Sequence, residues 1–155
     1  MIRILKVKRK KQGAKIEFEN ATADKTDKFT FDCGDDPVPA FDKALGVLVD
    51  HVVEICELPE DYAEGMKVSS VSFSYGGPNE TMGAVITAQK SLSTANSPLI
   101  LNTPHLPSEP YSGNIADPSP VLDGDCVDAL SEVLSQAALY IDGVRQQGDL
   151  FEGEK

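Results

Sequence analysis

The sequence predicts an α+β fold, a mainly antiparallel sheet with two helices packed on one face, in the order βββα followed by ββ(β)α. Several segments alternate apolar and polar residues with the two-residue period of a half-buried strand. Two longer segments repeat apolar residues every three or four positions, as amphipathic helices do. The strands come in consecutive runs instead of alternating singly with helices, which favours antiparallel pairing.

Three strands are predicted before the first helix. Phe29 and Phe31, in the last of them, alternate with polar neighbours as residues on one face of a sheet do. Because the three strands follow one another with short connections, they are expected to form an antiparallel meander. The strands are expected within residues 1–16, whose charged residues are all basic, within 14–20 and within 28–33, with a loop at 20–27.

The first helix is expected over about residues 39–57. Asp35 and Asp36 precede an early proline, Pro37, and aspartates there can cap free N–H groups and oppose the positive end of the helix dipole. Pro59 closes the segment. The apolar stripe that would face the sheet consists of Phe41, Leu45, Leu48, Val52 and Ile55.

The second helix is expected over about residues 126–147. Asp123 and Asp125 announce it, and Gly148 is a plausible stop. Its apolar stripe is predicted to contain Val127, Leu130, Leu134, Ala138 and Ile141.

Between the helices lies a hairpin with strands at 67–75 and 81–92, joined by a turn rich in glycine and proline. In its first strand, Ser70, Ser72 and Ser74 should face away from the apolar side. A short third strand is expected at 98–101. The following stretch, 102–120, holds five prolines and should be irregular, and a connection of this length is either functional or mobile.

The composition indicates one acidic domain, residues 1–147, followed by a flexible tail at 148–155. The chain has 155 residues and a formal net charge of -11. It contains no apolar run long enough for a membrane span and no signal-peptide pattern at Met1, so a cytoplasmic protein is expected. Its three cysteines are odd in number and widely spaced, which argues against a disulfide framework and against a thiolate zinc site.

The tail carries the most specific motif. Residues 147–151, Gln-Gly-Asp-Leu-Phe, resemble the pentapeptide by which bacterial DNA polymerases and repair proteins dock on the sliding clamp. The resemblance implies that Gln147, Asp149, Leu150 and Phe151 bind the partner, with the two apolar residues as anchors. Gly148 departs from the motif, where an apolar residue is usual, and this should weaken binding. In the alternative interpretation, the two anchors fold back over the end of the last helix.

A second resemblance supplies a biological context. Residues 71–75, 83–92 and 97–105 are similar to small uncharacterised proteins of bacteriophage and prophage genomes. The resemblance implies an accessory protein acting in a bacterial cytoplasm. Our leading hypothesis is therefore a binding protein without enzymatic activity that acts in DNA replication or recombination, with the host sliding clamp as its partner. Association with a second copy of the chain remains possible.

Single-stranded nucleic-acid binding is one alternative. Lys6, Lys8, Lys10 and Lys11 could follow a phosphate backbone, because each base set against a phosphate releases counterions. Aromatic residues for base stacking are expected nearby, and Phe18 and the two phenylalanines of the third strand are the nearest. In the competing structural interpretation, the bases protect an edge strand from pairing with other chains.

A small-ligand or enzymatic site is the other alternative. It would use the 102–114 loop, which contains His105, together with the serine face of the hairpin. The sequence identifies no catalytic residue, no metal ligands and no cofactor. His51 is interpreted as a residue on the surface of the first helix, and the acidic pairs near the helix boundaries as caps.

Overall fold

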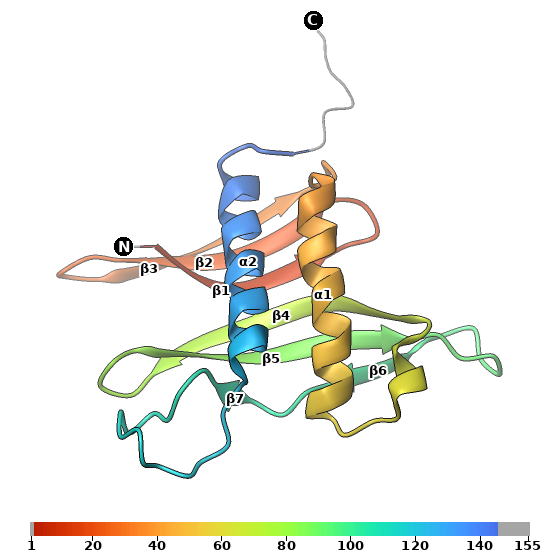
Figure 1. The fold of residues 1–155 in the computed structure, drawn as a ribbon. Coiled ribbons are helices and arrows are strands. Elements are labelled where there is room, and N and C mark those ends of the chain that lie inside the picture. Colours follow the sequence, from red (N-terminus) through yellow and green to blue (C-terminus); the bar gives the residue numbers. More distant parts are fainter. Residues whose placement is uncertain (1, 146–155) are drawn as a thin grey trace, which may run out of the picture.

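A computed structural model describes residues 2–145, and Figure 1 shows two helices side by side across one face of a sheet. The helices are α1 (Pro39–Ile55) and α2 (Gly124–Ile141), with a short 3-10 helix, η1 (Glu60–Ala63), after α1. The strands are β1 (Ile2–Arg9), β2 (Ala14–Ala21), β3 (Thr26–Cys33), β4 (Met66–Gly76), β5 (Thr81–Lys90), β6 (Leu99–Asn102) and β7 (Leu106–Pro107).

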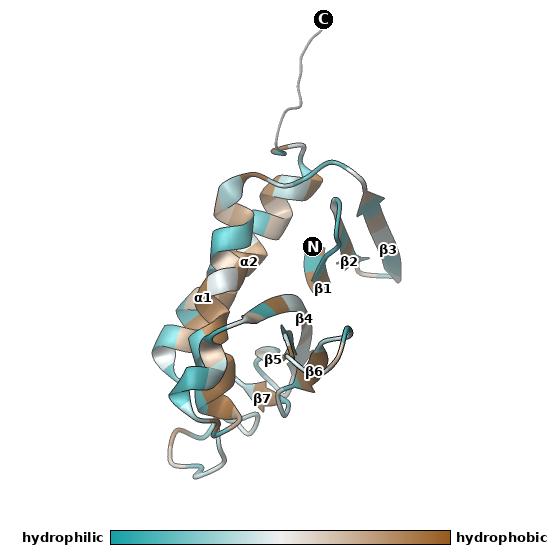
Figure 2. Cartoon of the chain, turned by 90° about the vertical axis from the view of Figure 1, so that its right-hand side faces the viewer, coloured by the Kyte–Doolittle hydropathy of each residue, from teal (hydrophilic) through white to brown (hydrophobic). Residues whose placement is uncertain are grey.

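The sheet confirms the predicted α+β class. Its seven strands follow the order β3-β2-β1-β4-β5-β6, with β7 also paired to β5, and all of the pairings are antiparallel. Seen from the side, both helices lie on the same side of the sheet (Figure 2). Neither helix in residues 2–145 is long and apolar enough to cross a membrane.

The basic first strand is an interior strand of this sheet. β1 pairs with β2 on one side and with β4 on the other, and a bulge between Ile4 and Lys6 shifts its register. The interpretation of its bases as protection for a sheet edge is therefore wrong, because both edges of β1 are already hydrogen-bonded. The outer strands of the main path are β3 and β6.

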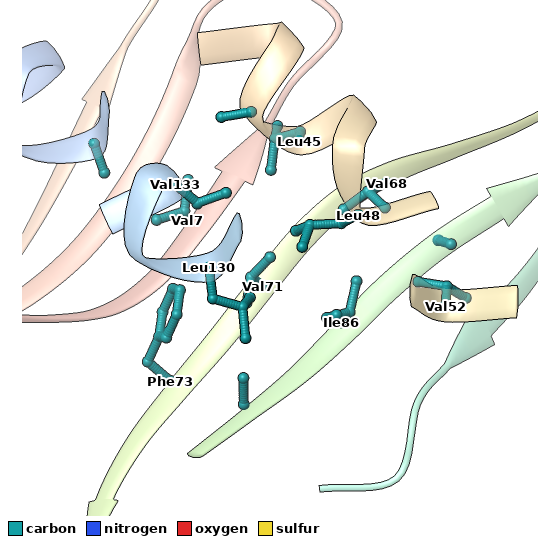
Figure 3. Packing of buried hydrophobic residues seen from close by; sticks show 14 of the residues in the cluster. Val7, Leu45, Leu48, Val52, Val68, Val71, Phe73, Ile86, Leu130 and Val133 are labelled. Carbon is teal, nitrogen blue, oxygen red and sulfur yellow. The ribbon is translucent and has the colours of Figure 1, made fainter. Parts of the chain in front are cut away.

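The core lies between the sheet and the two helices, as Figure 3 shows. Leu48 of α1 and Leu130 of α2 are fully buried against Val7 of β1 and Val71 of β4. These side chains come from the predicted alternating and helical patterns, so the apolar period of each element decides which face it buries. Phe29 is an exception, because it is 46% exposed and stacks on Phe18 near the edge of the sheet.

The first helix begins where predicted, but the expected aspartate cap is wrong. Val38 occupies the N-cap position and makes no side-chain capping bond. The Asp36 carboxylate instead accepts the backbone N–H of Gly13 at 2.9 Å and lies 3.4 Å from the Arg9 guanidinium. That N–H and the guanidinium hold the pKa of Asp36 below its usual range. Asp36 thus connects the entrance of α1 to the β1–β2 turn.

The second helix begins at Gly124, and Asp123 caps it by accepting the Cys126 N–H at 2.8 Å. The predicted end at residue 147 is wrong, since the helix stops at Ile141. Gly143 has a φ of +106°, which L side chains rarely adopt, and its N–H donates to the Tyr140 carbonyl at 3.1 Å. Gly143 therefore replaces Gly148 as the terminating glycine.

The predicted apolar stripe of the second helix is only partly correct. Leu130 is fully buried, whereas Leu134 and Ile141 are half-buried and Ala138 is exposed. The fully or nearly fully buried residues of α2 are Cys126, Leu130, Val133, Ala137 and Tyr140. Apart from Leu130, each of these buried residues therefore lies one position before the residue that was predicted to be buried.

Candidate functional site

The structure brings a serine, a histidine and a tyrosine together on the face of the sheet that no helix covers. Ser74 lies on β4, His105 follows β6, and Tyr111 comes from the proline-rich stretch. The Ser74 Oγ is 2.7 Å from the His105 Nε2, and the Tyr111 hydroxyl is 3.1 Å from the same nitrogen. The imidazole and phenol rings stack with centroids 6.0 Å apart. We call these three residues the Ser–His–Tyr cluster.

The cluster depends on the strand beneath it having no side chain at one position. Gly83 of β5 is the register partner of Ser74. A Cβ atom on Gly83 would lie 2.5 Å from the Tyr111 hydroxyl and 2.7 Å from the His105 Nε2. Glycine therefore allows the imidazole and phenol to lie directly on the sheet.

The backbone around the cluster holds the loop against β5. The buried Thr103 makes two hydrogen bonds to Ile86, and the Ser108 N–H donates to the Met82 carbonyl at 2.7 Å. Further along, the Leu122 N–H donates to the Pro107 carbonyl at 2.9 Å. The proline-rich stretch is thus irregular, as predicted, while β7 and these bonds attach its first part to the sheet, a strand that the sequence pattern does not reveal.

A serine hydroxyl bonded to an imidazole is the arrangement that activates a serine as a nucleophile. Here Ser74 and His105 are exposed, and no carboxylate within residues 2–145 hydrogen-bonds to His105. The cluster therefore offers two hydroxyl groups and one imidazole that can exchange hydrogen bonds with a small polar ligand. Nearby on the same face, the Thr87 hydroxyl donates to the Asn102 side-chain oxygen at 2.7 Å.

The sequence pointed to only part of this cluster. Ser74 and His105 belong to the two segments that the small-ligand alternative combined, and the structure brings those segments together. Tyr111 and Gly83 were not singled out by the sequence. A glycine inside an otherwise regular strand was the available signal, since such a glycine often marks a close approach by another part of the chain.

The four lysines of the proposed nucleic-acid site differ in their pairing with acidic residues. Lys10 is paired with Asp32, while neither Lys6, Lys8 nor Lys11 has an ion pair within the described part of the chain. Lys6 and Lys8 lie beside Ser72 and Ser70 on the uncovered face of the sheet. The two arginines of β1, in contrast, form ion pairs: Arg3 with Glu19 and Glu80, and Arg9 with Asp36 and Asp42.

The aromatic residues expected to stack on nucleic-acid bases lie on the opposite face. Phe18 pairs in register with Ile4 and Phe29, and it lies beside Leu134 and Ala138 of α2. The lysines of β1 and the phenylalanines of the meander therefore cannot contact one nucleic-acid strand together on one face of the sheet.

The tail residues Gln147, Asp149, Leu150 and Phe151 lie outside the described residues. The chain that leads to them is held firmly as far as Arg145, whose backbone forms a β-bridge with Pro37. The Arg145 Nε donates to the Tyr140 carbonyl at 3.2 Å, and its guanidinium lies 5.0 Å from the ring centroid of Phe31.

A groove runs beside the last turns of α2. It has a volume of about 340 Å³ and an apolar lining. Tyr75 closes one side, where its hydroxyl donates to the Ile4 carbonyl at 2.9 Å and its ring lies under the Arg3 guanidinium. The apolar residues that line it are Ile2, Ile4, Phe18, Leu134, Ala138 and Ile141.

Comparison of the chain with protein families, with curated proteins and with solved structures found no match.

Proposed function

We propose that this protein is an accessory binding module of the kind encoded by bacteriophages. In this proposal it acts in DNA replication or recombination by docking its C-terminal peptide on a host protein such as the bacterial sliding clamp. The α+β body is the support, and the residues that bind the partner are Gln147, Asp149, Leu150 and Phe151. The phage context rests on the resemblance of residues 71–75, 83–92 and 97–105.

The observation that carries the proposal is the position of the pentapeptide relative to the last anchored residue. Arg145 is fixed by the bridge to Pro37 and by its contacts with Tyr140 and Phe31. The motif begins only two residues later, at Gln147. A short docking peptide next to a fixed point has little chain to order when it is captured, which reduces the entropic cost of binding.

The chemistry of the peptide suits capture in an extended form. Leu150 and Phe151 are adjacent apolar anchors of the type that fills a pocket in a partner, and the Gln147 amide supplies directional hydrogen bonds. Gly148 provides no side chain at the second position. We therefore expect weaker binding than for a peptide with an apolar residue there.

The test is direct binding to a purified bacterial sliding clamp, measured by calorimetry with three forms of the protein. The intact chain should bind, whereas a chain ending at Gln146 and a Leu150→Ala/Phe151→Ala double variant should not. Glu152→Gln/Glu154→Gln is a matched control, because it changes the same tail outside the pentapeptide and should keep binding. Absence of binding by the intact chain would refute the proposal.

Thermal unfolding of the double variant distinguishes docking from packing. A free docking peptide requires the same melting temperature for the double variant and the intact chain. If the double variant melts several degrees lower, the two side chains contribute to the fold, and the groove beside α2 is where they would pack.

The Ser–His–Tyr cluster supports a second candidate function, binding of a small polar ligand. The 2.7 Å contact between the Ser74 Oγ and the His105 Nε2 is the observation that favours it. A fluorophosphonate probe, which labels activated serines, tests whether the pair does more than bind. Labelling that is lost in Ser74→Ala and in His105→Ala would indicate a nucleophile, and no labelling would exclude an activated serine.

A further inference from the structure

A histidine and two carboxylates from distant parts of the chain meet where the two helices pack. His51 and Glu54 are three residues apart on α1, and Asp123 is the N-cap of α2. One ligand atom from each side chain lies within 4.8 Å of the corresponding atoms of the other two. His51 is half-buried, whereas Glu54 and Asp123 are exposed to solvent.

We propose that His51, Glu54 and Asp123 bind a divalent transition-metal ion, with Zn²⁺ as the reference ion. An imidazole nitrogen combined with carboxylate oxygens is a donor set that zinc uses. Mg²⁺ and Ca²⁺ prefer oxygen donors alone, so the imidazole selects against them. Three protein ligands would leave a position on the ion for water or another ligand.

Each of the three side chains has a donor atom available for the ion. The Asp123 Oδ1 accepts the Cys126 N–H at 2.8 Å, and the carboxylate also interacts with the Asp125 N–H, the Glu54 carboxyl group and the His51 imidazole, so it already faces the other two side chains. His51 and Glu54 are on the same side of α1, because residues three apart on a helix are neighbours. The capping bond also fixes the Asp123 carboxylate in the folded protein. Less side-chain entropy is therefore lost when this carboxylate binds the ion.

The charges around the three residues favour a cation. Within residues 2–145, no lysine or arginine forms an ion pair with Glu54 or Asp123. Two carboxylates this close repel each other, and a cation between them removes the repulsion. The last turn of α1 contains no basic residue, although the negative end of a helix dipole favours positive charge there.

An adjacent hollow extends this negative region. It has a volume of about 580 Å³, and four of the six residues that line it are acidic: Asp50, Glu54, Glu57 and Glu60. Glu54 therefore belongs both to the hollow and to the proposed site. A concave surface of one charge sign raises the local concentration of counterions, so the hollow would draw a divalent cation toward the three ligands.

Zn²⁺ binding by the full chain tests the proposal, after treatment with a chelator to remove bound metal. One Zn²⁺ per chain is expected in competition with a chromophoric chelator, together with a higher melting temperature when Zn²⁺ is present. His51→Gln should weaken binding by at least about 10-fold, since even the loss of an outer partner of a metal ligand costs about 10–100-fold. Stoichiometric binding that is unchanged in His51→Gln would overturn the proposal, as would no binding by the intact chain.

Asp123→Asn keeps the variant folded while removing the ligand charge. Asparagine caps helices about as well as aspartate, so the melting temperature of the metal-free variant should match that of the intact chain. The rise in melting temperature that Zn²⁺ causes in the intact chain should be absent in this variant. An Asp123→Asn variant that Zn²⁺ stabilises as much as the intact chain would contradict the assignment of this residue as a ligand.

Two controls separate ligation from other ways of binding zinc. Asp50→Asn removes a charge from the hollow one helical turn before Glu54 but removes no ligand, so it should weaken binding far less than Glu54→Gln does. An equal loss in Asp50→Asn and Glu54→Gln would indicate diffuse attraction and would overturn the site. Co²⁺ in place of Zn²⁺ should give a spectrum without thiolate charge-transfer bands, and their presence would assign the metal to cysteines instead.

Discussion

Thr103 and Ile86 exchange two hydrogen bonds in the interior of the protein. The Ile86 N–H donates to the Thr103 Oγ1 at 2.9 Å, and the Thr103 N–H donates to the Ile86 carbonyl at 2.9 Å. Thr103 is only 4% exposed. Its hydroxyl thus accepts a hydrogen bond from the backbone of β5 just beyond the end of β6, and it helps to hold the first part of the proline-rich stretch against the sheet.

Replacing Thr103 by valine should lower the free energy of unfolding by about 1–3 kcal/mol. Valine has nearly the same shape as threonine, but it leaves the Ile86 N–H buried without a hydrogen-bond partner. A buried donor without a partner costs free energy, because it has also lost its bond to water. Urea unfolding of Thr103→Val and Thr103→Ser measures the effect. Serine keeps the accepting oxygen and should lose less, so equal losses for the two variants would show that the methyl group, and not the hydrogen bond, is responsible.

At Thr81, replacement by valine should instead raise the free energy of unfolding. Thr81 is 6% exposed, and its Oγ1 has no hydrogen-bond partner among residues 2–145. Thr81→Val replaces a buried, unpaired hydroxyl with a methyl group, so the free energy of unfolding should rise by about 1 kcal/mol. Urea unfolding of Thr81→Val beside Thr103→Val gives the comparison, and destabilisation at both sites would contradict this account of Thr81.

Stability should fall at alkaline pH because of Tyr140. Burial, and then the interaction with the Cys33 thiol, raise the pKa of the Tyr140 hydroxyl above its usual range. The stability that comes from the neutral hydroxyl is fully present below the unfolded pKa of about 10. It is lost as the pH rises further, because the unfolded chain then releases a proton that the folded chain retains.

Urea unfolding between pH 7 and pH 11 checks this prediction with Tyr140→Phe. At pH 7 the variant should be less stable by about 0.5–1.5 kcal/mol, since the hydroxyl also donates to the Asp35 carbonyl at 2.5 Å. The difference should shrink above pH 10. Tyr62→Phe, at a ring that is 37% exposed, is the matched control. A constant difference at every pH would rule out Tyr140 as the source.

Replacing Gly83 by alanine should detach the Ser–His–Tyr cluster and leave the body folded. The new methyl group would meet the ends of two side chains, Tyr111 and His105, which can swing away at little cost to the sheet. The imidazole resonances of His105 should move toward those of a free histidine, and amide hydrogen exchange should accelerate over residues 103–113. Gly46→Ala, where a Cβ meets nothing within 4 Å, is the control. Unchanged resonances in Gly83→Ala would contradict the packing described here.

The local patterns of the sequence predicted the helices, the hairpin and the class of fold. These patterns did not identify the buried face of a helix where two neighbouring rows of apolar residues were both candidates. In α2, Val133 and Leu134 both continue an apolar stripe, as do Ala137 and Ala138, and periodicity alone ranks neither above the other. The position of α1 and the sheet selects Val133 and Ala137, which is information carried by tertiary packing.

The candidate sites were harder to predict because they join segments that are far apart in the sequence. Neither His51 nor Asp123 has a metal-ligand pattern around it, and only the packing of α1 on α2 brings them together. Similarly, the register of β4 on β5 sets Ser74 beside Gly83, over which His105 lies. The tail motif was visible because all of its residues are adjacent in the sequence.

The interior position of β1 has a consequence for how the protein is made. β1 is synthesised before the other strands of this sheet, and it can pair with β2 at once because only a short turn separates the two. Its other edge must wait for β4, which is synthesised after β2, β3 and α1. Closing that long loop is entropically costly before the contacts form. We therefore expect the joining of β1 to β4 to limit the folding rate, with the nascent meander exposing an unpaired strand until β4 arrives.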